Sequence, residues 1–182
     1  MGDPKHLRPD EVEIFVTREL RKAGIEVSRL KVTGRDRRDE RGEEGFTIEM
    51  SGVMRVHDAD RSVLVECRNQ RDPVRPEDVE ALAAKLAAAK ADHGMMFSTS
   101  GYDPVAVRDA RTRGLPLLTV ADGKSAFARS PWGMAGQPPA WVPEYMSEVV
   151  DVDVTGKLRH HLVVADRPEL ILERLGAEAD GQ

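Results

Sequence analysis

An acidic and a basic side chain stand two positions apart at the end of an apolar run, at Glu66 and Arg68. The run Val63-Leu64-Val65 is typical of a buried strand. Because side chains alternate along a strand, Glu66 and Arg68 are predicted to share one face and Cys67 to point to the other. A buried carboxylate is costly unless it has a partner. Two alternatives are open: the pair binds a metal and a phosphate, or its members bind only each other.

The segments around this pair predict an α/β domain with a mixed sheet, in which a hairpin contributes antiparallel strands beside parallel ones. Apolar residues recur at helical spacing after Pro9, and Gly24 ends that helix. Later, strands and helices alternate with short links, which predicts parallel pairing. We expect strands over 25–32, 46–56, 62–68, 94–98 and 115–120, helices over 9–24, 76–91 and 104–113, and an exposed loop over 34–45.

The last part of the chain differs in composition. Residues 131–139 resemble a linker, and residues 149–164 predict a hairpin that turns at 155–157, followed by a short helix over 168–175. There are 23 basic and 23 acidic residues up to position 130, but 4 and 9 beyond it. We therefore predict a domain over 1–130 and an acidic extension over 131–182, which packs on the core or on a second copy.

Composition excludes several classes of protein. Charged residues make up 32% of the 182-residue chain and apolar residues 40%, a normal globular balance. No run is long enough for a membrane span, and the polar N-terminus is unlike a signal peptide. The single cysteine, Cys67, excludes an internal disulfide and a multi-thiolate zinc site, and it fits a reducing compartment. We expect a cytoplasmic protein without membrane contact.

Three segments together resemble the restriction-endonuclease-like superfamily, the PD-(D/E)XK nucleases, and within it the Mrr-type branch. The resemblance covers roughly residues 10–120. The first helix has Glu13 near its start and a glycine at its end, and Glu66-Cys67-Arg68-Asn69 is similar to the family's catalytic strand. The third segment, Phe97-Ser98-Thr99-Ser100-Gly101-Tyr102, resembles the strand and turn that precede another family helix.

The resemblance implies a restriction-endonuclease-like α/β core, with a mixed central sheet flanked by helices and a C-terminal β-hairpin and helix added. It also implies DNA as partner and Mg²⁺ as cofactor, with Mn²⁺ as a substitute, because carboxylates of such sites hold a hard cation that polarises the phosphodiester. Glu66 would be the principal metal ligand, and Glu49 and Glu13 auxiliary ligands. Glu66, Arg68 and Glu49 would be the catalytic residues, and Arg68, Thr99 and Ser100 the candidate phosphate contacts.

Two departures from the family pattern stand in this sequence. Arg68 occupies the usual lysine position, and arginine can hold a phosphate but does not lose its proton. The family aspartate is missing from the preceding strand, where Ser51, Gly52 and Val53 stand instead. Glu49 is the nearest carboxylate on that strand. Strand alternation allows it to share the face of Glu66 if a bulge at Gly52, which the glycine suggests, corrects the register.

Two functions remain open on this evidence. The first is a Mg²⁺-dependent DNA endonuclease with a degenerate Glu-x-Arg site, dimeric through its C-terminal hairpin because cutting both strands of a duplex favours a twofold assembly. The second is a catalytically inactive copy of the fold that acts as a DNA-binding, scaffolding or protein-interaction module.

Overall fold

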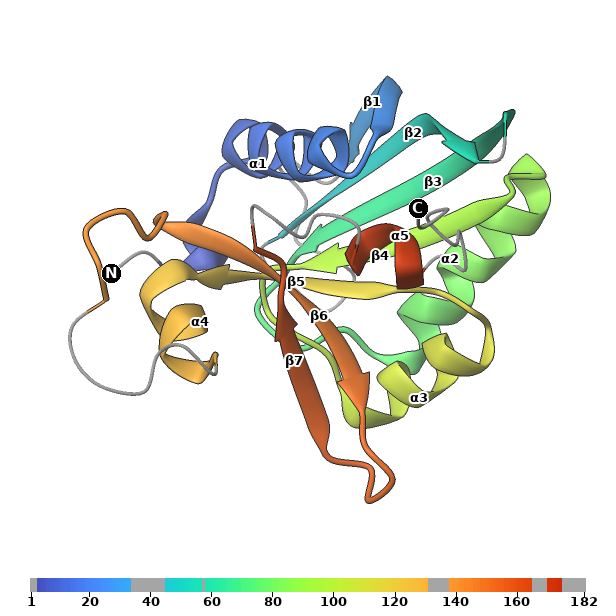
Figure 1. Cartoon of the computed structure of the whole chain (residues 1–182). Helices are drawn as coiled ribbons and strands as arrows, with labels where there is room; N and C mark the ends of the chain where they lie inside the picture. The colour runs from blue at the N-terminus through green and yellow to red at the C-terminus, as the bar shows by residue number, and fades with distance from the viewer. Residues whose placement is uncertain (1–2, 34–44, 57, 131–137, 165–169, 175–182) are drawn as a thin grey trace.

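A computed structural model describes residues 3–33, 45–56, 58–130, 138–164 and 170–174. Seven strands form one sheet in the order in which they occur along the chain (Figure 1). The strands are β1 (Ile25–Thr33), β2 (Phe46–Val56), β3 (Ala59–Asn69), β4 (His93–Ser98), β5 (Leu117–Asp122), β6 (Tyr145–Val152) and β7 (Leu158–Leu162). The helices are a 3₁₀ turn (Pro4–His6), α1 (Pro9–Lys22), α2 (Pro76–Ala89), α3 (Pro104–Thr112), α4 (Gly123–Arg129) and α5 (Leu170–Arg174).

The sheet is mixed, as the sequence predicts. Strands β3, β4 and β5 are parallel neighbours, and helices α2 and α3 connect them. The remaining neighbours, β1–β2, β2–β3, β5–β6 and β6–β7, are antiparallel. Because the carboxyl ends of β3 and β4 lie at the same edge of the sheet, the residues that follow Glu66 lie next to the Ser98–Gly101 turn.

Helices cover both faces of the sheet (Figure 1). Helix α1 packs on one face, where Phe15 and Leu20 belong to the same core cluster as Cys67. Helices α2 and α3 pack on the other face, where Leu82 belongs to the same cluster as Leu64. Since side chains alternate along β3, Glu66 and Arg68 share the face of Leu64 and point towards α2.

The expected bulge at Gly52 is wrong. β2 and β3 pair in an unbroken antiparallel register from Phe46 opposite Asn69 to Val56 opposite Ala59. The irregularity lies instead in β1, between Val27 and Arg29. Gly52 is required for another reason, because a Cβ atom there would lie 2.8 Å from the backbone oxygen of Glu26.

The predicted C-terminal hairpin is confirmed as β6 and β7, and β6 pairs with β5, so the hairpin extends the sheet of its own chain. The sequence did not predict α4, whose N-cap Asp122 accepts hydrogen bonds from the backbone N–H and the hydroxyl of Ser125. Most of the expected loop over 34–45 and of the linker over 131–139 lies outside the described residues, as do both expected ends of the last helix. Within the described ranges, no helix has the length and apolar character needed to cross a bilayer. The division at residue 130 stays a prediction.

Candidate active site between β3 and α2

Glu66 is fully buried, and both of its carboxylate oxygens contact a basic group. Oε1 accepts a hydrogen bond of 2.7 Å from Nε of Arg68, which confirms that the two side chains share a face. Oε2 lies 2.5 Å from Nζ of Lys85, a residue of α2. Burying a carboxylate is costly unless it is paired and hydrogen-bonded. Arg68 and Lys85 together meet that requirement.

Glu49 is the cross-strand neighbour of Glu66. The two residues stand directly opposite each other on β2 and β3, so their side chains emerge side by side on one face of the sheet. Nζ of Lys85 lies 3.2 Å from Oε2 of Glu49, so a single ammonium group contacts both carboxylates. Glu49 therefore reaches the face of Glu66 through the regular register, without the bulge that the sequence suggested.

The protonation state of Lys85 follows from these contacts. Burial by itself would lower the pKa of Lys85, because it disfavours the charged form. The hydrogen bonds and charges of Glu66 and Glu49 outweigh this effect and raise the pKa above its ordinary value. Lys85 is therefore held as an ammonium ion between the two carboxylates.

Arg68 is fixed from a second side by Asp78. Nη1 of Arg68 donates a hydrogen bond of 2.7 Å to Oδ1 of Asp78, in the first turn of α2. The other oxygen of Asp78 accepts from the backbone N–H of Arg75 at 3.0 Å, which caps the helix. The carboxylate that begins α2 therefore also holds the guanidinium of Arg68 in place.

Sequence reasoning missed both Asp78 and Lys85. A signal for them was present, because Asp78, Leu82 and Lys85 recur at helical spacing and so lie on one face of α2. Leu82 is fully buried against the sheet, which turns that face towards β3. Finding the site required knowing that α2 packs on the side of Glu66 and not on the side of Cys67.

The other predicted site residues are arranged as follows. Glu13 belongs to α1, which packs on the opposite face of the sheet, and it lines a surface hollow together with Ile14 and Arg18. The structure therefore does not bring Glu13 to Glu66. Thr99 adjoins the site, because its backbone N–H donates to the carbonyl of Arg68 at 3.1 Å. The Ser100 hydroxyl donates to the carbonyl of Asp72 at 2.8 Å.

Glu49 and Glu66 form an oxygen donor set of the kind that binds a divalent cation together with water and substrate oxygens. Among the described residues, no three or more histidine, cysteine or acidic side chains are grouped so that they could hold a metal. Mg²⁺ is commonly bound through only one or two carboxylates, with water and substrate phosphate oxygens as the other ligands. An ammonium ion already contacts both carboxylates, so the pair can be bridged by one cation.

The mixed sheet with helices on both faces is a nuclease-like α/β fold. The chain belongs to the Mrr-type restriction endonuclease family (Mrr_cat), which it matches over residues 5–125. That match includes β1 to β5 and every residue of the candidate active site. A search of the curated proteins gives no match. Restriction-endonuclease-like domains of this superfamily generally use divalent metal ions.

Proposed function

We propose that this protein binds DNA and hydrolyses its phosphodiester bonds with Mg²⁺ at the Glu49–Glu66 pair. The observation that supports the proposal best is the ammonium of Lys85, which lies within 3.2 Å of Glu49 and 2.5 Å of Glu66. Two acidic side chains that share one cation in this way can share another. The family match makes nucleic acid the substrate class to test.

The chemistry of each side chain suggests a separate role for it in the reaction. Glu49 and Glu66 would hold Mg²⁺, which when bound polarises the scissile phosphodiester and activates water. Arg68 keeps its proton and would contact a phosphate oxygen through a fixed guanidinium. Asp78 would be a positioning residue, because its two oxygens accept hydrogen bonds from Arg68 and from the backbone N–H of Arg75.

Lys85 supplies an amine that can exchange a proton with water, which the guanidinium of Arg68 cannot do. An amine can accept a proton, whereas a guanidinium in a protein does not give its proton up. Glu66 and Glu49 keep Lys85 charged in this structure. Lys85 could orient or deprotonate a water only when another cation neutralises those two carboxylates.

A second candidate function is an inactive nuclease-like module that binds DNA. One observation favours it: each oxygen of Glu66 already contacts a basic side chain, Arg68 at Oε1 and Lys85 at Oε2. In an inactive protein these ion pairs would satisfy the buried carboxylate of Glu66 without a metal ion. The two candidates differ in whether divalent metal displaces Lys85 from the carboxylates.

The test is cleavage of supercoiled plasmid by the full chain in Mg²⁺ or Mn²⁺, with Glu66→Gln and Glu49→Gln as site variants. Glu80→Gln is the matched control, because Glu80 is an exposed glutamate on α2. The proposal predicts nicking by the wild-type protein and by the control. It predicts a loss of at least about 10- to 100-fold in rate for each site variant, because changes even to the groups that support metal ligands have an effect of that size.

DNA binding measured on the same proteins separates the alternatives. If neither the wild-type protein nor any variant cleaves DNA, but all of them bind it with a steep salt dependence, catalysis is contradicted and the inactive module is supported. If the wild-type protein neither cleaves nor binds DNA, both nucleic-acid functions are contradicted. Cleavage that persists in Glu66→Gln would refute the assignment of the site.

A further inference from the structure

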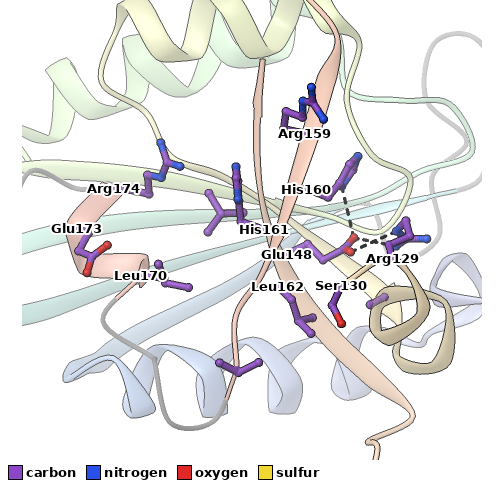
Figure 2. A pocket seen from close by; sticks show the side chains of 13 residues that line it. Arg129, Ser130, Glu148, Arg159, His160, His161, Leu162, Leu170, Glu173 and Arg174 are labelled. Atoms are coloured by element: carbon purple, nitrogen blue, oxygen red, sulfur yellow. Dashed lines mark hydrogen bonds and ion pairs between the residues drawn. The ribbon is translucent and has the colours of Figure 1, made fainter. Parts of the chain in front are cut away.

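A pocket of about 720 Å³ lies beside the C-terminal hairpin (Figure 2). Its lining comes from α4, β6, β7, α5 and the residues next to them. All of these residues lie between Ala126 and Arg174, beyond the segment that matches the nuclease family. The family match therefore assigns no role to this pocket.

The pocket is separate from the candidate active site. Arg68 on β3 pairs with Ser98, Ser98 pairs with Thr119, and Thr119 pairs with Glu148 on β6. Three strand spacings separate Arg68 from Glu148, which amounts to about 14 Å. No residue of the Glu49–Glu66 site lines the pocket.

Glu148 is a buried carboxylate in the wall of the pocket, with only 2% of its surface exposed. Nε and Nη2 of Arg129 donate to its two oxygens at 3.3 and 2.9 Å, and Nδ1 of His160 lies 3.4 Å from Oε2 (Figure 2). Burial raises the pKa of Glu148, but the hydrogen bonds from His160 and Arg129 outweigh burial and bring the pKa below its ordinary value. Glu148 is therefore charged, and it holds both basic groups in fixed positions.

The basic groups that Glu148 orients remain partly open to solvent. The side chain of Arg129 is 50% exposed. Arg159 of β7 and Arg174 of α5 also line the pocket, and each is fixed by a carboxylate, Asp153 at 3.0 Å and Asp151 at 3.0 Å. Asp151 and Asp153 do not line the pocket. The acidic partners of these two arginines thus stand outside, while the guanidinium groups contribute to the wall.

The character of the lining indicates the class of ligand. Three arginines and two histidines line the pocket, against two carboxylates, of which Glu148 is already bound by Arg129 and His160. Asp151 and Asp153 pair with two of these arginines from outside the pocket, so the lining carries no large excess of positive charge. The wall itself presents more N–H donors than carboxylates, which suits an oxyanion such as a phosphate monoester. The remaining lining is mostly apolar and includes Val149, Leu162 and Leu170. It suits an apolar or aromatic body attached to the phosphate.

We propose that this pocket binds a phosphate monoester of the size of a nucleoside monophosphate, with the phosphate on Arg129 and His160. The ligand is either a free nucleotide or the 5′-phosphorylated end of a nucleic-acid strand, since both present the same group. The pocket does not depend on catalysis at Glu66, so a failure of the proposed nuclease function leaves this proposal standing.

The test is calorimetric titration of the full chain with deoxyadenosine monophosphate and with deoxyadenosine. Removing Arg129 alone would leave Glu148 buried without its main partner, so the informative variant replaces both, as Arg129→Met with Glu148→Leu. Arg159→Gln removes a lining arginine that pairs with Asp153 and not with Glu148. Arg113→Gln is the matched control, because Arg113 is a partly exposed arginine paired with Asp109 on α3, outside the pocket.

The nucleotide should bind at least tenfold more tightly than the nucleoside. The double variant should weaken nucleotide binding at least tenfold, Arg159→Gln by a smaller factor, and Arg113→Gln not at all, with thermal melting confirming that each variant is folded. A 5′-phosphorylated oligonucleotide that binds more tightly than the mononucleotide identifies a strand end as the source, and the reverse order identifies a free nucleotide. Equal affinities for nucleotide and nucleoside, or an unchanged affinity in the folded double variant, would overturn the proposal.

Discussion

Replacing Lys85 by methionine tests how the candidate active site is held together. The change keeps a long apolar side chain on α2 but removes the ammonium that contacts Glu49 and Glu66. Glu66, which is fully buried, then keeps Arg68 as its basic partner, and Glu49 loses its ion pair with Lys85. We expect the variant to fold with reduced stability and to gain stability from Mg²⁺.

The size of the loss follows from the burial of the two partners. Removing one partner of a buried ion pair costs about 3–5 kcal/mol. Glu66 keeps its contact with Arg68, and the side chain of Lys85 is 42% exposed, so solvent screening reduces the effect. We expect a loss of about 2 kcal/mol in the free energy of unfolding. At free Mg²⁺ tenfold above its Kd, about 1.4 kcal/mol should be recovered.

The assay is urea unfolding in the presence of a chelator and in increasing Mg²⁺. The matched control is Lys22→Met, because the side chain of Lys22 is 41% exposed and its Nζ lies 2.9 Å from the buried carboxylate of Glu19 on α1. The control should lose stability but gain from Mg²⁺ only as much as the wild-type protein does, whereas Lys85→Met should gain more. An equal response to Mg²⁺ in Lys22→Met and Lys85→Met, or none in Lys85→Met, would refute the idea that Lys85 stands where a metal binds.

Three further predictions concern the fold around the two sites. The pKa of Glu148 lies below its ordinary value in the folded chain, so Glu148 stabilises the fold above about pH 4.5 and less as the pH falls through its folded pKa. The difference in free energy of unfolding between wild type and Glu148→Gln should therefore shrink on acidification from pH 6 to pH 3, and a constant difference would contradict this. Burial raises the pKa of the Cys67 thiol, so iodoacetamide at pH 8 should label the native chain only as fast as the chain unfolds. Labelling of the native chain as fast as that of the urea-unfolded chain would show that Cys67 is accessible. Gly52→Ala should cost about 1–3 kcal/mol in urea unfolding, because the new methyl group would meet the Glu26 carbonyl; an unchanged midpoint would mean that β1 can move aside.

Local patterns were sufficient to predict most of the fold. Strand alternation at Glu66-Cys67-Arg68 predicted which side chains share a face, and Arg68 does contact Glu66. Alternating strands and helices with short links predicted the parallel neighbours β3, β4 and β5. These inferences hold because they rest on the geometry of single strands and of short connections, which depends little on the rest of the chain.

Contacts between distant segments could not be predicted in the same way. Lys85 lies 19 residues from Glu66, and only the packing of α2 on that face of the sheet brings the two together. The error at Gly52 has a similar origin, because a glycine in a strand fits both a bulge and a close approach of a neighbouring backbone. The partner strand, β1, determines which of the two occurs. The pocket around Glu148 also requires α4 to meet β6, and unlike the β6–β7 hairpin this contact is indicated by no local pattern.

We propose that Glu49 and Glu66 together bind a divalent cation at the place where Lys85 now contacts them. The most direct test is Mn²⁺ binding followed by electron paramagnetic resonance on wild type, Lys85→Met and the double variant Glu49→Gln with Glu66→Gln. We predict one bound Mn²⁺ per wild-type chain, tighter binding in Lys85→Met, and no specific binding in the double variant. Mn²⁺ binding of unchanged affinity in the folded double variant would contradict the account.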